Sequence, residues 1–333
     1  MREHLVRISW IGCGTHANND LLPELSRVTN IELIAVCDLD EVKAQKACQQ
    51  YGFIEKYTDY TALFEQEEFD AVIVVGPPSL HFKVSELALS KNIHVFSEKP
   101  LALQLKDIKR LADLSVKNQC ITQVGHFLRH TPAIQNVKKL MKDDRFGNPI
   151  SFYGSYLTFG PWENREIYGY NSLEQSYLLI QGIHIIDLAM FLMGPIKSIK
   201  SNLIKSSTNR LNYALSIEFQ NHSVGNIVMS ASSPKWKCDI QIIGDKQSVI
   251  SVKDAQEVIF ESPSENVDTE FKSAQSLKID SSNSYGVENR NGYTLQFQSF
   301  VNCIINESES HPSFNDAFKV MEWIDYLINE EVR

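Results

Sequence analysis

The sequence predicts an α/β protein in which an N-terminal doubly wound parallel sheet is followed by an α+β part with a mainly antiparallel sheet. Up to about residue 125, short apolar runs alternate with helical stretches, which is typical of a parallel sheet covered on both faces. From residue 196 to about 262, strand-length runs follow one another without helices, which indicates antiparallel pairing. The 333 residues also exceed the usual size of a single core, so we expect two domains, 1–125 and 126–333.

The elements of the first domain are expected from apolar runs and from the residues that bound them. Asp40 can cap a helix that runs to Tyr51 and ends at Gly52. Strands are expected at 6–11, 31–37, 71–75, 93–96 and 120–124, and further helices after residue 14 and at 79–90 and 104–118.

The second domain is expected to open with a linking helix at 132–141, a turn at 146–149 and a strand at 150–159. An apolar helix over 185–193 is expected to start at His184. Helices at 293–306 and 315–330 should close the chain. The stretch 263–290 is rich in Ser, Asn and Glu, and we expect it to form loop and weak strand.

The turn after the first strand carries the pattern of a dinucleotide site. Gly12 permits a tight turn, Gly14 lets the backbone approach a pyrophosphate, and the small Ala17 lets the helix pack on the strand. Thr15 and His16 lie at the start of that helix, whose N–H groups favour phosphate. Asp38 follows the second strand, 24 positions after Gly14, close to the spacing of roughly 20 at which a carboxylate binds the adenosine ribose.

Asp38 also predicts the choice of dinucleotide. A 2′-phosphate would meet its carboxylate, and Leu39 offers no positive partner, so we expect NAD. Lys43 could reach round to such a phosphate, which leaves NADP as the alternative.

Charge and composition exclude several other classes. The net charge is −9 and Lys and Arg form no long block, so we expect no nucleic-acid partner. The first residues lead almost directly into a strand and no apolar run approaches 18 residues, so we expect a cytoplasmic protein without a membrane span.

The six cysteines form no C-x-x-C pair and are expected to be reduced packing residues, with a reactive Cys13 as the alternative. His126 and His130 have the spacing of metal ligands, but Pro132 argues against a helix there, and we expect no metal.

Three motifs in this order resemble the Gfo/Idh/MocA family of NAD(P)-dependent sugar and inositol oxidoreductases. They are the glycine turn with Asp38, the Glu98-Lys99-Pro100 segment after a strand, and the segment from Gly182 to Asp187. Weaker similarities are Pro77 with His81, Gly125-His126-Phe127 with Arg129, and the helix from Tyr293 to Phe300. The resemblance covers essentially the whole chain and implies a Rossmann domain followed by a domain for substrate binding and oligomerisation.

The resemblance implies roles for two groups of residues. Lys99 and His184 are the expected catalytic residues, with Lys99 holding the substrate oxygen and Glu98 supporting the nicotinamide ribose or Lys99 itself. The expected cofactor-binding residues are Gly12, Gly14, Thr15, His16, Ala17, Asp38, Gly76, Pro77, His81, Glu98 and Lys99.

Substrate binding is expected from residues of both motif segments and of the loop between them. They are His126, Arg129, Trp162, Arg165, Tyr168, Gln181, His184 and Asp187. Arg129 or Arg165 could bind a substrate phosphate or carboxylate, or equally form a structural ion pair. Asp187, three residues after His184, could orient the imidazole or bond a neighbouring loop.

The chain departs from the family pattern at Ile180, where members usually carry Asp or Asn four residues before the histidine; Gln181 is the nearest substitute. Gly76 and Pro78 likewise replace the usual Thr and Asn on either side of Pro77. The expected activity is NAD-dependent hydride transfer at a secondary hydroxyl or ketone of a sugar, sugar phosphate, nucleotide sugar or cyclitol. The alternatives are elimination or glycoside cleavage with internal recycling of the cofactor, and a non-catalytic dinucleotide-binding regulator. Family members commonly associate through the second sheet, which implies a homodimer or homotetramer.

Overall fold

The computed structural model describes residues 5–160, 168–263, 274–280 and 292–330, and their contacts divide them into two compact units. The first unit comprises residues 5–126, 168–171 and 293–325. The second comprises 127–160, 172–263, 274–280, 292 and 326–330. Neither unit is a continuous stretch of chain, and the expected domain boundary after residue 125 remains a prediction.

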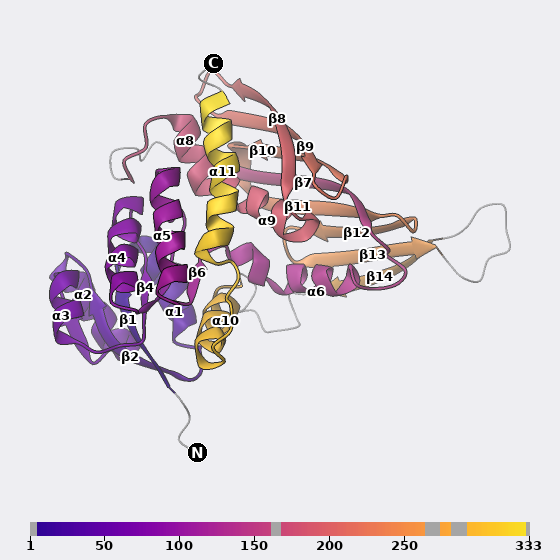
Figure 1. Cartoon of the computed structure of the whole chain (residues 1–333). Helices are drawn as coiled ribbons and strands as arrows, with labels where there is room; N and C mark the ends of the chain where they lie inside the picture. The colour runs from indigo at the N-terminus through magenta and orange to yellow at the C-terminus, as the bar shows by residue number, and fades with distance from the viewer. Residues whose placement is uncertain (1–4, 161–167, 264–273, 281–291, 331–333) are drawn as a thin grey trace, which may run out of the picture. The chain divides into compact units, whose positions relative to one another are not determined.

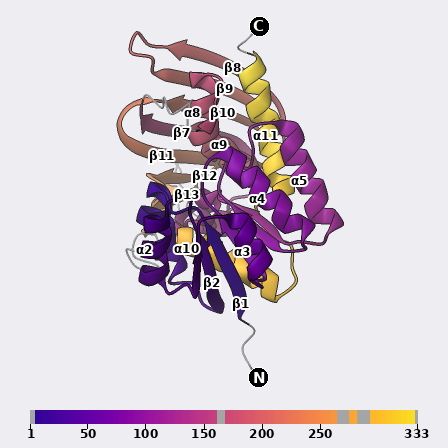
Figure 2. The same cartoon turned by 90° about the vertical axis from the view of Figure 1, so that its left-hand side faces the viewer.

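The first unit is built on a six-stranded sheet in which every pairing is parallel. The strand order β3-β2-β1-β4-β5-β6 reverses direction at β1 and β4, as in a doubly wound sheet, which confirms the predicted class. Figure 2 shows β1 and β2 running side by side. The strands are β1 (Val6–Ile11), β2 (Ile31–Cys37), β3 (Glu55–Tyr57), β4 (Ala71–Val74), β5 (His94–Ser97) and β6 (Thr122–Val124).

The helices of the first unit come from both ends of the chain (Figure 1). They are η1 (Ala17–Leu21), α1 (Leu22–Leu25), α2 (Glu41–Tyr51), α3 (Tyr60–Gln66), α4 (Pro78–Ser90), α5 (Leu105–Lys117), α10 (Tyr293–Ile305) and α11 (Phe314–Glu330), of which the part up to Asp325 belongs to this unit. β3 and α3 were not predicted, because three and seven residues are too few for a periodic pattern to show. The helix after the glycine turn was expected, but its residues 17–21 form a π-helical turn.

Local chemistry explains the bounds of α2 as predicted. The Asp40 carboxylate accepts hydrogen bonds from the backbone N–H groups of Val42 and Lys43, which have no partner within the helix. At the other end Gly52 adopts φ +80°, the left-handed conformation that ends helices and that glycine reaches without strain.

Helix α10 belongs to the core of the first unit although some 170 residues of sequence separate it from β6. Phe297 lies edge-on to Trp10 of β1, with ring centroids 6.2 Å apart, and 4.8 Å from Phe96 of β5. Phe300 lies 5.9 Å from the same Phe96 ring. These fully buried aromatic rings join the end of the chain to its first and fifth strands.

The second unit is built on an eight-stranded sheet in the order β14-β13-β12-β11-β7-β10-β9-β8. All of its pairings are antiparallel except β10 with β7, which confirms a mainly antiparallel sheet. The strands are β7 (Pro149–Phe159), β8 (Ile196–Lys205), β9 (Leu211–Phe219), β10 (Val224–Ser230), β11 (Ser232–Gly244), β12 (Ser248–Lys253), β13 (Glu257–Pro263) and β14 (Ala274–Asp280). β14 lies in the stretch expected to hold loop and weak strand.

One long helix lies against this sheet. It runs without a break from Leu173 to Met193, as α8 (Leu173–Tyr177), the π-helical segment η3 (Leu178–Gly182) and α9 (Ile183–Met193). The shorter η2 (Phe127–His130) and α6 (Pro132–Leu140) precede β7. The expected helix start at His184 was therefore wrong: the apolar pattern begins a residue earlier and continues an existing helix rather than starting one.

By length and composition the helix Leu173–Met193 could cross a membrane, so the expectation that no run approaches that length was also wrong. The signal is weak, because 78% of its most apolar window is buried inside the structure, as in the core helix of a soluble protein. Its α9 part packs on β7, where Ile185 approaches Gly154 and where Phe152 and Tyr156 are buried.

Candidate active site

The two glycines of the turn after β1 meet different constraints. Gly12 has φ +99°, and a Cβ built on it would lie 1.8 Å from the carbonyl oxygen of Val75. Gly14 is exposed, and a Cβ built on it would meet nothing within 4 Å. Gly12 is therefore required because Val75, directly after β4, lies too close to leave room for a side chain. Gly14, in contrast, leaves a space that a ligand can enter.

The residues after Gly14 begin the helix as predicted. Thr15 and His16 are exposed and Ala17 is fully buried. His16 Nδ1 lies 2.8 Å from the Asp20 carboxylate. The Asn18 side chain, which the sequence analysis missed, donates hydrogen bonds to the carbonyl oxygens of residues 13 and 14 and so stabilises the turn.

Asp38 is tied to the glycine turn. Its Oδ2 accepts a hydrogen bond of 2.6 Å from the backbone N–H of Cys13, and its Oδ1 accepts one of 2.9 Å from that of Asp40. The carboxylate remains partly exposed and each oxygen has a second lone pair, so it can still accept from a ribose hydroxyl. Lys43 Nζ lies 3.5 Å from the Asp40 carboxylate. Asp40 would therefore compete with a 2′-phosphate for the ammonium group on which the NADP alternative depends.

Burial settles the state of the Cys13 thiol. Burial, and next the Asp38 carboxylate, raise the pKa of Cys13 to about 12, so the thiol stays protonated near neutral pH. The packing role fits this environment, and the alternative of a reactive thiolate at the helix start does not.

His81 links two loops at the carboxyl edge of the sheet. Its Nε2 accepts from the N–H of Gly76 at 2.9 Å, so its Nδ1 carries the proton that the Pro100 carbonyl accepts, also at 2.9 Å. The ring is 1% exposed, and burial lowers its pKa to about 4. Both nitrogens thus bind backbone, so His81 supports the predicted cofactor residues Gly76 and Pro77 instead of touching a cofactor itself.

Glu98 and Lys99 follow β5 directly. The Glu98 side chain is 4% exposed and its Oε2 accepts from the N–H of Lys99 at 3.1 Å. A Cβ on Gly125 would lie 2.1 Å from Glu98 Oε1, so only glycine leaves room for this carboxylate. Burial lowers the pKa of Lys99, and the Glu98 charge opposes part of that effect. The Lys99 side chain therefore loses its proton at a lower pH than an exposed lysine does.

Tyr293, at the start of α10, is a further residue of this region that the sequence analysis did not name as a site residue. Its ring lies 6.0 Å from that of His16. Burial, and next the Glu98 carboxylate, raise the pKa of its phenol. The phenol therefore stays protonated near neutral pH.

These features fit a dinucleotide. The open space at Gly14, the exposed helix start and the partly exposed Asp38 carboxylate match the needs of a pyrophosphate and a ribose. Gly12, Gly14, Thr15, His16, Asp38, Gly76, Pro77, Glu98 and Lys99 would hold it, with Ala17 packing beneath.

In the second unit His184 lies in an aromatic setting. It is the second residue of α9 and is 4% exposed. Its ring lies 5.1 Å from that of Phe127, edge to face, and 5.9 Å from that of Tyr156, nearly parallel at 25°. Two rings therefore fix the plane of the imidazole.

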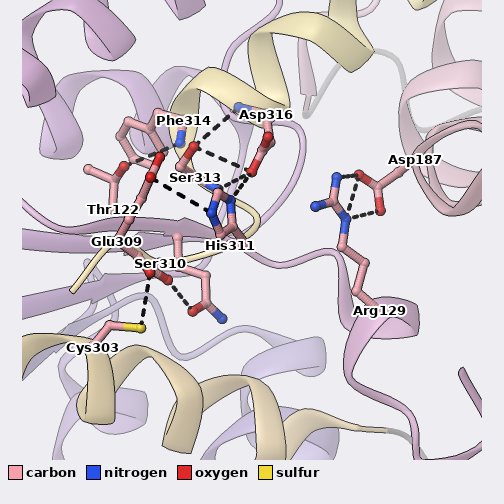
Figure 3. A network of polar contacts seen from close by, with 11 residues as sticks. Thr122, Arg129, Asp187, Cys303, Glu309, Ser310, His311, Ser313, Phe314 and Asp316 are labelled. Carbon is pink, nitrogen blue, oxygen red and sulfur yellow. Dashed lines mark hydrogen bonds and ion pairs between the residues drawn. The ribbon is translucent and has the colours of Figure 1, made fainter. Parts of the chain in front are cut away.

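Arg129 and Asp187 form a buried ion pair. Arg129 Nε donates to both Asp187 oxygens, at 2.9 and 3.1 Å, and its Nη2 donates to Oδ1 at 2.6 Å (Figure 3). The side chains are only 8% and 1% exposed, and the guanidinium also lies 5.0 Å from the Phe191 ring. Of the two alternatives for Arg129, the structure shows the ion pair, in which the Asp187 carboxylate binds a side chain of the η2 segment that follows β6.

The other predicted substrate residues are spread over the two units. His126 is buried in the first unit, and Tyr168 stacks there on Tyr170 with centroids 5.8 Å apart. Gln181 is partly exposed in the π-helical segment of the second unit. Trp162 and Arg165 lie outside the described residues.

Two family models match the chain. One, described as an oxidoreductase family with an NAD-binding Rossmann fold, covers residues 6–126, and the other, described as the oxidoreductase family C-terminal alpha/beta domain, covers 138–330.

Curated relatives are similar over different shares of their length. D-apiose dehydrogenase of Paraburkholderia graminis is 28% identical over 214 residues, which are 62% of this chain and 54% of that protein. scyllo-Inositol 2-dehydrogenase (NAD(+)) of Bacillus subtilis is 27% identical over 321 residues, 91% of this chain and 87% of that protein. The match thus spans about half of the first relative and most of the second.

The fold is also that of a solved structure, a dehydrogenase from Chromobacterium violaceum. The two superpose with a TM-score of 0.87 at 22% identity, over 97% of this chain and 94% of that one.

Proposed function

The chain belongs to the Gfo/Idh/MocA oxidoreductase family, whose two models cover nearly all of it, and from this we propose that it is a dehydrogenase acting on a secondary hydroxyl or ketone of a carbohydrate-type molecule. Its first domain is the NAD-binding Rossmann domain of that family. When bound, NAD supplies the hydride acceptor. The protein then has to bind the alcohol, take its proton and orient it.

Lys99 carries this proposal. Its buried amine has a lowered pKa and follows a parallel strand at the carboxyl edge, where open α/β sheets bind ligands. During oxidation the neutral amine accepts the hydroxyl proton, and during reduction the ammonium returns it. The Glu98 carboxylate accepts a hydrogen bond from the backbone N–H of Lys99 and so holds that part of the backbone in place.

His184 is the proposed second acid/base group. The Phe127 and Tyr156 rings hold the plane of its imidazole. In the proposed reaction it holds the substrate hydroxyl.

NAD is the proposed cofactor in preference to NADP. The Asp38 carboxylate would repel a 2′-phosphate, and Lys43 of α2 is paired with Asp40.

Two relatives suggest the substrate class. One is a D-apiose dehydrogenase and the other a scyllo-inositol dehydrogenase, which supports a sugar, sugar phosphate, nucleotide sugar or cyclitol for this chain. A cytoplasmic homodimer or homotetramer completes the proposal. The second sheet would supply the interface, because Tyr153, Val224 and Val228 expose about half of their surface on it.

The test compares wild type with Lys99→Ala and with Lys106→Ala, an exposed lysine on α5. NADH formation is followed at about 340 nm with sugars, sugar phosphates, UDP-sugars and inositols. Lys99→Ala should lower turnover by orders of magnitude and leave NAD affinity near normal, because many other residues hold the dinucleotide, whereas Lys106→Ala should match wild type. Unchanged turnover in Lys99→Ala contradicts its assigned role. Bound cofactor without net NADH formation in wild type contradicts the dehydrogenase and supports cofactor recycling or regulation.

A further inference from the structure

Strand β11 carries an irregular stretch beside the end of β7. Ser232 pairs with Phe159 and Lys237 pairs with Leu157, so residues 233–236 stand opposite a single residue of β7. Extra residues of this kind bend a strand and change the direction of a side chain, and they are frequent next to active sites. The last of them is Trp236.

Trp236 continues the aromatic contacts that begin at His184. The Trp236 ring lies 5.9 Å from Tyr156 at 84°, and Tyr156 in turn stacks on His184. Tyr156 is 2% and His184 4% exposed, whereas Trp236 is partly exposed. Trp236 is thus the member of this series that a ligand can reach.

The helix that carries His184 also has a partly exposed apolar side chain. Ile180 lies four residues before His184 on the same helix, so the two share one side of it. Leu178 and Leu179 are fully buried, but Ile180 is partly exposed. The carboxylate nearest in sequence, Asp187, is bound to Arg129. The surface beside His184 therefore offers apolar and aromatic contacts.

Resting on the proposed function, we propose that Trp236 is the platform on which the ring of the substrate lies, with Ile180 as a second apolar contact. Such a platform binds the face of a six-membered ring that presents axial C–H groups, because contact with an indole removes apolar surface from water. The chain should therefore prefer rings whose hydroxyls are equatorial over rings that carry axial hydroxyls on both faces.

Binding to the full chain loaded with NAD tests this inference. The probes are scyllo-inositol and D-glucose, with D-altrose, whose axial hydroxyls lie on opposite faces, as the contrasting ring. Wild type should show quenching of tryptophan fluorescence by the first two probes and a lower affinity for D-altrose. Calorimetry measures the same affinities independently of fluorescence.

Three variants identify the tryptophan that causes the fluorescence quenching. Trp236→Phe should remove most of the quenching and keep most of the affinity, and Trp236→Ala should weaken binding roughly tenfold or more, since the whole ring is lost. Trp323→Phe, on α11, should retain both the quenching and the affinity. Full quenching in Trp236→Phe, an unchanged affinity in Trp236→Ala, or no quenching by any probe in wild type would each overturn the inference.

The outcomes separate this inference from the proposed function. Quenching that depends on Trp236 without NADH formation supports the platform and contradicts the dehydrogenase. NADH formation that is unaffected by Trp236→Ala supports the dehydrogenase and contradicts the platform.

Discussion

At the scale of single residues, two glycines in one turn serve separate purposes. Gly12 is fixed by folding, since its φ of +99° and the nearby Val75 oxygen exclude any side chain. Gly14 is not needed by the fold, because the space beside it is open. The glycine spacing in the sequence does not distinguish these two roles, and the tertiary contact with Val75 does.

Substituting each glycine separates folding from binding. Gly12→Ala should lower the melting temperature strongly or prevent soluble expression, because its Cβ would overlap the Val75 carbonyl. Gly14→Ala should keep the wild-type melting temperature and weaken NAD binding roughly tenfold or more, because the methyl group occupies the pyrophosphate space. Thermal denaturation and NAD titration measure the two effects, and a strongly unfolded Gly14→Ala would contradict this division.

His81 predicts a dependence of stability on pH. Its pKa is about 4 in the folded protein against an ordinary 6.5, so between these values the unfolded chain binds more protons. The stability that neutral His81 contributes is present above pH 6.5 and is lost as the pH falls toward 4. The expected loss is roughly 3 kcal/mol, at 1.36 kcal/mol for each pH unit.

Urea denaturation across this pH range compares wild type with His81→Asn. The variant should be less stable at neutral pH, because two loop contacts weaken, but its stability should fall less steeply toward pH 4. The exposed His222→Asn is the control and should keep the wild-type slope. If the free energy of unfolding fell with pH equally steeply in wild type and in His81→Asn, the low pKa of His81 would be contradicted.

At the scale of elements, the sequence predicts long periodic segments and misses short or continuous ones. Helix α2 was located by its caps at Asp40 and Gly52. The helix around His184 was placed too late, because its apolar residues continue through a π-helical turn that no cap residue marks. The pairing of Arg129 with Asp187, which joins η2 to α9, could not be ranked above a substrate contact from sequence alone.

The ion pair between these two elements predicts a test of stability. Asp187→Asn leaves a buried guanidinium without its counter-charge and should lower the free energy of unfolding by roughly 3–5 kcal/mol. The double variant Arg129→Met with Asp187→Leu should recover most of that loss, because no buried charge remains. A single variant as stable as wild type in urea denaturation would contradict the pair's assigned role.

At the scale of the whole molecule, both units combine distant parts of the chain. In the first, the segment between α10 and α11 covers β6: the Pro312 carbonyl accepts from Val124 N–H, and Ser310 donates to the Gln123 side chain. The Thr122 hydroxyl accepts from Phe314 N–H, a contact that Figure 3 shows. These bonds occupy an edge strand that would otherwise expose unpaired backbone groups.

The exposed sheet face predicts the state of assembly. Val228, opposite Ser155 in the β10–β7 pair, exposes 49% of its surface. If this face forms the proposed interface, Val228→Glu should reduce the mass in light scattering to that of one 37.9 kDa chain, because it places a charge in an apolar contact. Val116→Glu on α5 should keep the wild-type mass, and an unchanged mass in Val228→Glu would contradict this interface.

The sequence by itself determined the class of both sheets, most element positions, the glycine turn with Asp38 and the family. These depend on local periodicity, on turn chemistry and on spacing within one βαβ unit, all of which neighbouring residues encode. Only the tertiary structure decided that α10 joins the first core, that His81 binds two loops, that Arg129 pairs with Asp187 and that Trp236 lies beside the Tyr156–His184 stack. Each of these depends on which residues meet across many intervening positions, and that is set by packing rather than by local pattern.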